Sequence, residues 1–179
     1  METMKNKFQQ QISAALQQQL GYRNVWQVPR LQKVVVNIGL GPGLKDPKFV
    51  EAAASTMRRI TGQKPVETQS KQSISNFKIR QGQVIGLKAT LRGERMFSFL
   101  QKLVHVTLPR VRDFRGLDPK GVDRNGNLSL GFKENLPFPE ISADEVERLH
   151  GVEVTVVTSA RNRDEGLALL RQLGFPFRS

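Results

Sequence analysis

Residues 62–95 read GQKPVETQSKQSISNFKIRQGQVIGLKATLRGER, and this stretch predicts the centre of the fold. Its second half, from Val84 to Arg92, alternates between two kinds of side chain, which is typical of a strand with one buried face. The residues expected to face the core are Ile85, Leu87, Ala89 and Leu91. The residues expected to face outward are Val84, Gly86, Lys88, Thr90 and Arg92.

The first half of the stretch is expected to form a long, exposed, basic loop over residues 71–82. Its only apolar side chains are Ile74, Phe77 and Ile79, so it can bury little surface. No acidic residue lies between Thr68 and Gly93, and the five basic residues there are Lys71, Lys78, Arg80, Lys88 and Arg92. A basic loop that leads into a strand with cations and a hydroxyl group on its outer face indicates a polyanionic partner such as RNA.

Length and composition predict one globular domain. The chain has 179 residues, of which 38% are hydrophobic, and we expect an N-terminal helix (1–21) followed by an α+β core (22–179). Cysteine is absent, which excludes disulfide bonds, thiolate metal sites and cysteine nucleophiles. The sequence has no apolar run long enough for a membrane span and no signal-peptide pattern, so we expect a cytoplasmic protein.

Charge is unevenly distributed along the chain. The formal net charge is +12. Residues 54–112 hold twelve basic and two acidic residues, whereas residues 134–165 hold eight acidic and three basic residues. This segregation favours a nucleic-acid-binding face in the middle of the chain and a separate acidic surface later. The alternative is that these charges are the ordinary solvated faces of helices and loops.

The order of the expected elements defines the fold class. Expected helices cover residues 4–20, 47–61, 94–108, a short segment from Ser142, and 162–174; expected strands cover residues 30–41, 64–70, 84–92, 128–132 and 152–158. The mixture of hairpin-like and helical connections predicts an α+β fold. It would have one mostly antiparallel sheet of about five strands, with helices packed on one face and an RNA-binding face on the other. Asp46 and Pro47 predict the start of the second helix, and Pro109 predicts the end of the third.

Several single residues have more than one interpretation. Asn37 is the polar residue of an aliphatic strand, so it is either a hydrogen-bonding group for a partner or a solvent-facing side chain. Tyr22 and Trp26, the only Tyr and Trp, could stack on RNA, but we expect them to dock the N-terminal helix onto the core. His105 and His150 have no metal-ligand spacing, and no catalytic motif occurs. We therefore expect no enzyme activity, no metal and no cofactor.

Seven segments together carry a resemblance to a known family. They are VPRLQKVVVNIGLG, ITGQKP, SISNFKIRQGQVIGLKATLRGERM, LPRVRDFRGL, GNLSLGFKE, FPEI and LLRQLGFPFR. In these segments, and in their order from Tyr22 to the end, the chain resembles the family of bacterial large-subunit ribosomal protein five, which binds 5S rRNA. The segment LDPKGVDRNGN and the glutamine-rich N-terminus depart from the family pattern, so contacts made there are not carried over.

The resemblance implies a structural constituent of the large subunit that attaches 5S rRNA to the large-subunit rRNA in the central protuberance. The rRNA-binding residues that it implies are Asn37, Gln63, Lys64, Lys88, Thr90 and Arg92. Loop 73–82 would contact the P-site tRNA through Ser73, Ser75, Asn76, Phe77, Lys78 and Arg80. A bridge to a small-subunit head protein, beside neighbouring ribosomal proteins, would use Arg110, Arg112, Arg115, Phe138, Glu140 and Asp144. No membrane and no small-molecule substrate is implied.

Two other classes of function compete with this interpretation. A free-standing RNA chaperone or double-stranded-RNA-binding protein would bind unrelated RNAs as tightly as 5S rRNA. A nucleic-acid-processing enzyme would turn over RNA or nucleotides, and the missing catalytic groups disfavour it.

Overall fold

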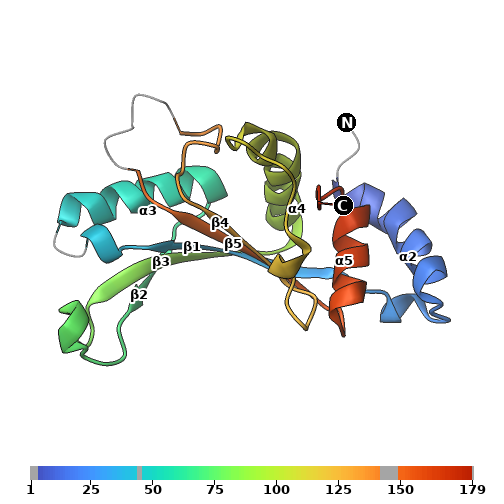
Figure 1. Cartoon of the computed structure of the whole chain (residues 1–179), viewed down its shortest axis with the longest axis horizontal. Helices are drawn as coiled ribbons and strands as arrows, with labels where there is room; N and C mark the ends of the chain where they lie inside the picture. Colours follow the sequence, from blue (N-terminus) through green and yellow to red (C-terminus); the bar gives the residue numbers. More distant parts are fainter. Residues whose placement is uncertain (1–3, 44–45, 142–148, 179) are drawn as a thin grey trace. The chain divides into compact units, whose positions relative to one another are not determined.

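The structure is a computed structural model that describes residues 4–43, 46–141 and 149–178 (Figure 1). Its main elements, in chain order, are α1 (Met4–Lys7), a π-helical turn (Phe8–Ile12), α2 (Ser13–Leu20), β1 (Leu31–Gly39), α3 (Pro47–Thr61), β2 (Val66–Gln69), β3 (Val84–Leu91), α4 (Gly93–Lys102), a second π-helical turn (Leu103–Thr107), β4 (Leu128–Phe132), β5 (Val152–Thr158) and α5 (Arg163–Gln172). The helix expected from Ser142 lies outside the described residues.

The five strands form one open, antiparallel sheet in the order β2-β3-β1-β5-β4. The predicted α+β fold class is therefore confirmed. β2 and β3 pair in antiparallel fashion, with Val66 opposite Lys88 and Thr68 opposite Gly86, and the register shifts after Thr68. β2 lies at an edge of the sheet, where the neighbouring Pro65 removes no ladder hydrogen bond.

Alternating burial confirms most of the predicted inner faces of the strands. The buried inward positions of β1, β3 and β5 are Val34, Val36, Ile38, Leu87, Ala89, Leu91, Val152, Val154, Val156 and Thr158. Ile85, near the start of β3, is half-buried. In the edge strand β4 only Leu128 is fully buried, whereas the alternate residues Leu130 and Phe132 are half-buried. An edge strand has a neighbour on one side only, so its apolar residues are covered less completely.

The chain divides into two compact units, and each is described by itself. We call the first the helical unit: Met1–Val34, Leu91–Leu130 and Thr155–Ser179. We call the second the loop unit: Val35–Thr90 and Gly131–Val154. The expectation of a single domain stays a prediction.

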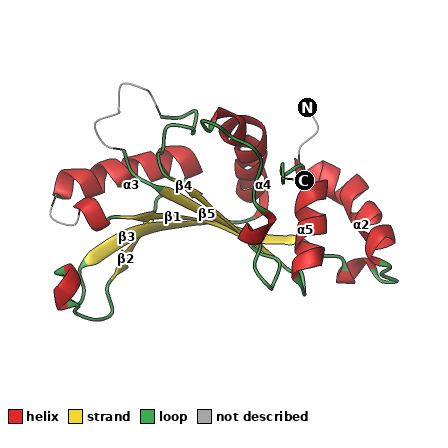
Figure 2. Ribbon diagram, in the orientation of Figure 1, coloured by secondary structure: helices red, strands yellow, loops and turns green. Residues whose placement is uncertain are grey.

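In the loop unit, α3 begins and ends as its sequence predicts. The Asp46 side chain accepts a hydrogen bond from the Lys48 N–H at 2.9 Å, Pro47 is the first helical residue, and Gly62 ends the helix with a φ of 65°. α3 buries Ala53, Met57 and Ile60. It lies along one face of the strands, and no described helix of this unit covers the other face (Figures 1 and 2).

In the helical unit, α2 packs against α5 and α1 packs against α4. The Tyr22 hydroxyl donates a 2.6 Å hydrogen bond to Glu165 Oε1 near the start of α5. This hydrogen bond to a carboxylate is the main reason that the Tyr22 pKa lies above its usual range. The predicted docking of the N-terminal helix is thus confirmed for Tyr22. It is wrong for Trp26, whose side chain is 79% exposed.

The helix that begins with α4 runs further than predicted. It continues through the π-helical turn Leu103–Thr107 into a 3-10 turn, Leu108–Arg110, so Pro109 does not end it. The reason is that Pro109 lies in the first two positions of the 3-10 turn, where the backbone N–H that proline lacks is not needed. Its buried side includes Met96 and Phe99, while Phe97 is half-buried.

No helix in the described part of the chain is long and apolar enough to cross a membrane.

Candidate nucleic-acid interface

The outer face of the loop unit's strands carries three of the predicted rRNA-binding residues. Asn37 on β1 and Thr90 on β3 are half-buried, and Lys88 on β3 is exposed. All three alternate with buried apolar residues, which is why their side chains point away from the core. Because β1 and β3 are neighbours in the sheet, these amide, ammonium and hydroxyl groups come from adjacent strands.

β2 extends this outer face toward the sheet edge. Opposed residues of an antiparallel pair share a face, so Val66 lies beside Lys88 and Thr68 lies beside Gly86. Val66 is 61% exposed. The face therefore combines an exposed apolar side chain with polar and cationic groups. This is the mixture that can contact ribose, base edge and phosphate of an RNA strand.

Gly86 brings the strands' polar side chains close together. A Cβ atom at this position would lie 2.9 Å from Thr68 Oγ1 and 3.1 Å from the Ile38 carbonyl oxygen. Such distances leave no room for a side chain, so any other residue would displace Thr68 or the neighbouring strand. Glycine is needed here because the side chain of Thr68 closes over it.

Asn37 has a partner that fixes its amide. Its Nδ2 donates a hydrogen bond to Glu153 Oε2 of β5 at 3.4 Å, which leaves Oδ1 as an acceptor for a partner. Glu153 is exposed and alternates with the buried Val152 and Val154. It was not among the predicted site residues, and its position in the alternating strand VEVTVVT is the signal that could have found it.

Gln63 connects the end of α3 to β3. Its Nε2 donates to the Thr90 carbonyl oxygen at 3.4 Å, and its backbone N–H bonds to Thr61 Oγ1 at 3.3 Å. Lys64 beside it is exposed. The remaining predicted rRNA-binding residue, Arg92, is exposed at the N-cap position of α4, in the helical unit.

The predicted basic loop is exposed, but it is also internally bonded. Two hydrogen bonds close its base, from Ser70 N to the Gln83 oxygen (2.9 Å) and from Gly82 N to the Ser70 oxygen (3.0 Å). Further out, Ile74 and Ile79 pair through two backbone hydrogen bonds of 2.9 and 3.1 Å. A short 3-10 turn, Ser75–Phe77, fills the space between them. The loop thus has its own small hairpin, which its sparse apolar content did not predict.

The loop presents all its predicted tRNA-contacting residues to solvent. Ser73, Ser75, Asn76, Phe77, Lys78 and Arg80 are exposed. Phe77 is 71% exposed, and Lys78 follows it with a left-handed φ of 54°. A shallow hollow beside the turn is lined by Ser73, Ser75, Lys78, Ile79, Arg80 and Gln81. The loop extends beyond the ends of β2 and β3 (Figure 1).

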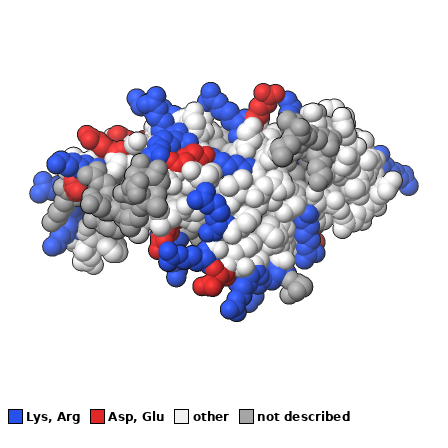
Figure 3. Space-filling model, turned by 90° about the horizontal axis from the view of Figure 1, so that it is seen from above, with Lys and Arg blue, Asp and Glu red and all other residues white. Residues whose placement is uncertain are grey.

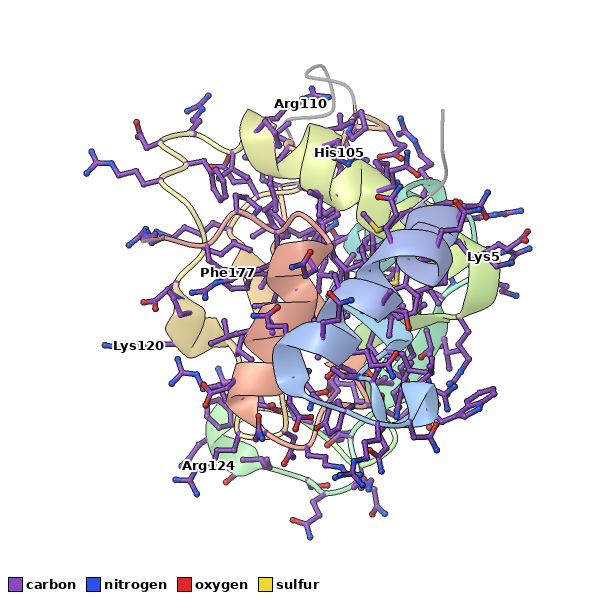
Figure 4. The ribbon with its side chains drawn as sticks, turned by 90° about the vertical axis from the view of Figure 1, so that its right-hand side faces the viewer. Lys5, His105, Arg110, Lys120, Arg124 and Phe177 are labelled. Carbon is purple, nitrogen blue, oxygen red and sulfur yellow. The ribbon has the colours of Figure 1, made fainter. Side chains whose placement is uncertain are left out.

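The predicted bridge residues fall in both units. In the helical unit, Arg110, Arg112 and Arg115 are exposed, and Arg110 projects outward from the end of its helical segment (Figure 4). In the loop unit, Glu140 is half-buried and its backbone oxygen accepts a hydrogen bond from Arg59. Asp144 lies outside the described residues.

Phe138 requires a correction. The family resemblance implies it as a bridge contact, but its side chain is fully buried, at 0% exposure, and packs edge-to-face against Phe132 at 5.3 Å between ring centroids. A phenylalanine between two prolines suggests an exposed loop residue, whereas here the prolines bracket a residue that fills the core. A partner cannot touch this ring without local unfolding.

Not all acids of the predicted acidic surface, residues 134–165, lie at the surface of the structure. Glu165 is buried, and its carboxylate accepts hydrogen bonds from Tyr22, the Arg161 N–H and the Asn162 side chain, so it is not a surface charge. Three further acids of the segment, Asp144, Glu145 and Glu147, lie outside the described residues. In the part of the loop unit around α3, basic and acidic side chains lie interspersed (Figure 3).

Comparisons with known proteins identify the family of this chain. A family model described as ribosomal protein L5 matches residues 24–80, and a second model, which describes the C-terminus of the same ribosomal family, matches residues 84–177. The chain belongs to the ribosomal protein L5 family. The protein named large ribosomal subunit protein uL5 from Heliobacterium modesticaldum is 53% identical over 179 residues, covering 100% of this chain and 99% of the relative.

Two more relatives of the same name agree with this assignment. The one from Symbiobacterium thermophilum is 52% identical over 99% of this chain and 98% of its own length. The one from Carboxydothermus hydrogenoformans is 49% identical over 99% of both chains. Members of the ribosomal protein L5 family are structural proteins of the ribosome, so the expectation that this chain is not an enzyme is confirmed. Within the described residues, no group of three or more His, Asp and Glu side chains is arranged to hold a metal ion.

Proposed function

We propose that this chain binds 5S rRNA on the outer face of β1, β2 and β3 and attaches it to the large-subunit rRNA in the central protuberance. As a member of the ribosomal protein L5 family, it is a structural constituent of the large ribosomal subunit, in the ribosome of the cytoplasm. The observation that carries the 5S proposal is the uncovered sheet face with Asn37, Lys88 and Thr90 on adjacent strands.

The groups on this face have distinct roles in the proposal. The Lys88 ammonium group pairs with a phosphate, which gives affinity without sequence preference. Asn37 Oδ1 and the Thr90 hydroxyl group hydrogen-bond to ribose 2′-hydroxyl groups or base edges, which supplies the preference for one RNA. Gln63 holds the end of α3 against β3. Lys64, the next residue, adds a second cation beside Lys88 in this proposal.

The exposed loop is proposed as the contact to the P-site tRNA. Successive tRNAs differ in sequence, so a protein that touches all of them must read backbone and shape. Lys78 and Arg80 pair with phosphates, while Ser73, Ser75 and Asn76 hydrogen-bond to the sugar-phosphate backbone. Phe77, on the 3-10 turn, offers an apolar surface to a ribose or base.

The bridge to a small-subunit head protein is proposed for the exposed arginines Arg110, Arg112 and Arg115 and for Glu140. Arginine is favoured at protein interfaces because its planar guanidinium group pairs with carboxylates through two hydrogen bonds. Phe138 is a core residue rather than a contact in this proposal.

A pair of charge-matched variants tests the 5S proposal. Lys88 and Lys120 are both exposed lysines, Lys88 on the sheet face and Lys120 on a 3-10 turn of the helical unit where it points away from the ribbon (Figure 4). Lys88→Ala is expected to weaken 5S rRNA binding and to lower the salt slope of log K by about 0.7–0.9. Lys120→Ala, with the same change in net charge, should leave both unchanged. Equal effects of the two variants would mean that net charge, not the sheet face, determines binding.

A further inference from the structure

The turn before β1 exposes the only tryptophan of the chain. Trp26 is 79% exposed and the adjacent Val25 is 56% exposed. Both lie in the 3-10 turn Val25–Gln27 of the helical unit, outside the sheet face and the loop considered above. Tryptophan is the largest apolar side chain, so leaving it in water is unfavourable unless a partner covers it.

The turn holds Trp26 in a defined position. The Asn24 side chain caps the turn by accepting the Trp26 N–H at 2.9 Å. After the turn, Val28 and Pro29 are buried, and Arg30 is fixed to Ser159 by two hydrogen bonds of 3.0 and 2.9 Å. An exposed side chain on a backbone anchored at both ends loses little conformational freedom when it binds a partner.

Arg30 occupies one face of the indole ring. Its guanidinium carbon lies 5.7 Å from the ring centroid, in the range of a cation–π contact. The high exposure of Trp26 leaves the other face of the ring open. An open aromatic face backed by a guanidinium group is a stacking platform for a flat, electron-rich ring such as a nucleobase.

The charges of the segments around Trp26 match an RNA strand. Arg23, Arg30 and Arg161 are exposed, and Arg161 is two residues from the Ser159 that binds Arg30. Glu165 is an acid that hydrogen-bonds to Tyr22, four residues before Trp26. Its carboxylate is buried and already accepts three hydrogen bonds. Cations beside an exposed aromatic ring favour a polyanion with unpaired bases over an apolar protein segment.

We propose that Trp26 and Arg30 form a stacking site for an unpaired base of RNA, with Arg23 and Arg161 placed to pair with the flanking phosphates. This site is separate from the proposed 5S-binding face, and its residues belong to the helical unit. It would give the chain a second point of attachment to RNA, selective for single-stranded nucleotides because a paired base cannot leave its stack without cost.

Because Trp26 is the only tryptophan, its fluorescence reports this site alone. The full chain is titrated with a short, unstructured oligoribonucleotide and with a duplex of the same sequence. The single strand should quench Trp26 emission, and the duplex should do so much less. With a labelled single strand, Trp26→Ala should bind roughly five- to 150-fold more weakly, whereas Trp26→Phe should retain most of the affinity.

Two variants separate this site from the proposed 5S-binding face. Arg30→Lys keeps the charge but not the planar guanidinium group, so it should reduce quenching. Lys88→Ala should leave quenching unchanged, because the sheet face is not involved. The assignment would be overturned if Trp26→Ala bound the single strand as tightly as the native chain, or if the duplex quenched Trp26 emission equally. It would also be overturned if added ribosomal proteins quenched the emission and the single strand did not. Far-UV circular dichroism of each variant establishes that it is folded.

Discussion

Replacing Asn37 and Thr90 together by alanine is expected to weaken 5S rRNA binding by roughly 30- to 1000-fold, with little change in the free energy of unfolding. Each replacement removes a hydrogen-bonding group and leaves an RNA group unpaired in the interface, at a cost of about 1–2 kcal/mol per site. Both side chains point away from the core, so their removal opens no cavity. Equilibrium binding to 5S rRNA and thermal unfolding measure the two effects separately.

Glu153 provides the control for this variant. Without Asn37, the Glu153 carboxylate loses its hydrogen-bond donor and is left as a negative charge without this donor on the proposed RNA face. If the loss of affinity came from that charge rather than from the missing amide, adding Glu153→Gln to Asn37→Ala would restore binding. We expect no more than partial restoration. Asn125→Ala, an exposed asparagine of the helical unit, should not change binding. Unaltered affinity of the double variant would mean that the sheet face does not bind 5S rRNA.

Deleting residues 73–80 is expected to weaken engagement of the P-site tRNA by at least about tenfold and to leave 5S rRNA binding within about twofold of the native protein. The deletion removes two cations and the exposed Phe77, each a contact worth about 1 kcal/mol or more. It leaves Lys71, Gln72, Gln81 and Gly82 as a four-residue loop. The hydrogen bonds from Ser70 N to the Gln83 oxygen and from Gly82 N to the Ser70 oxygen can still close the hairpin, because Gly82 tolerates the left-handed φ of 81° that the turn needs.

A variant that keeps the full loop distinguishes the loss of side-chain contacts to the tRNA from the effect of shortening the loop. Phe77→Ala combined with Arg80→Ala keeps the hairpin bonds of Ile74 and Ile79 and removes only exposed side chains. It should reproduce most of the tRNA defect in ribosomes that carry the variant, measured as the rate of tRNA dissociation from the P site. A deletion that abolishes 5S rRNA binding would reassign the loop to the 5S contact.

Local patterns in the sequence predicted the elements of this fold well. The alternation in β1, β3 and β5 is a period-two signal that each strand carries by itself, so Asn37, Lys88 and Thr90 could be placed on the outer face in advance. The start of α3 was equally local, because Asp46 and Pro47 act on the residues next to them. Family resemblance added the roles of these residues, which no spacing could supply.

Features that depend on distant residues escaped prediction. Tyr22 binds Glu165, which lies 143 residues away, and nothing near Trp26 signalled that it would stay exposed. Likewise, Gly166 of α5 packs so tightly on the turn at Gly126 that a Cβ atom would lie 2.4 Å from the Gly126 Cα. Phe138 was misplaced because its burial depends on tertiary packing, including the edge-to-face contact with Phe132 of β4, and not on the two prolines beside it.

The most direct test of the central claim is competition between 5S rRNA and an unrelated RNA of equal length for the full chain, across a salt series. About five phosphate contacts predict a log–log slope of roughly −3.5 to −4.5 for both RNAs. Specific recognition by the sheet face further predicts a large preference for 5S rRNA that persists at high salt, because the hydrogen bonds made by Asn37 and Thr90 are not screened as phosphate contacts are. Equal binding of both RNAs that disappears with salt would contradict it and would leave only a non-specific basic surface.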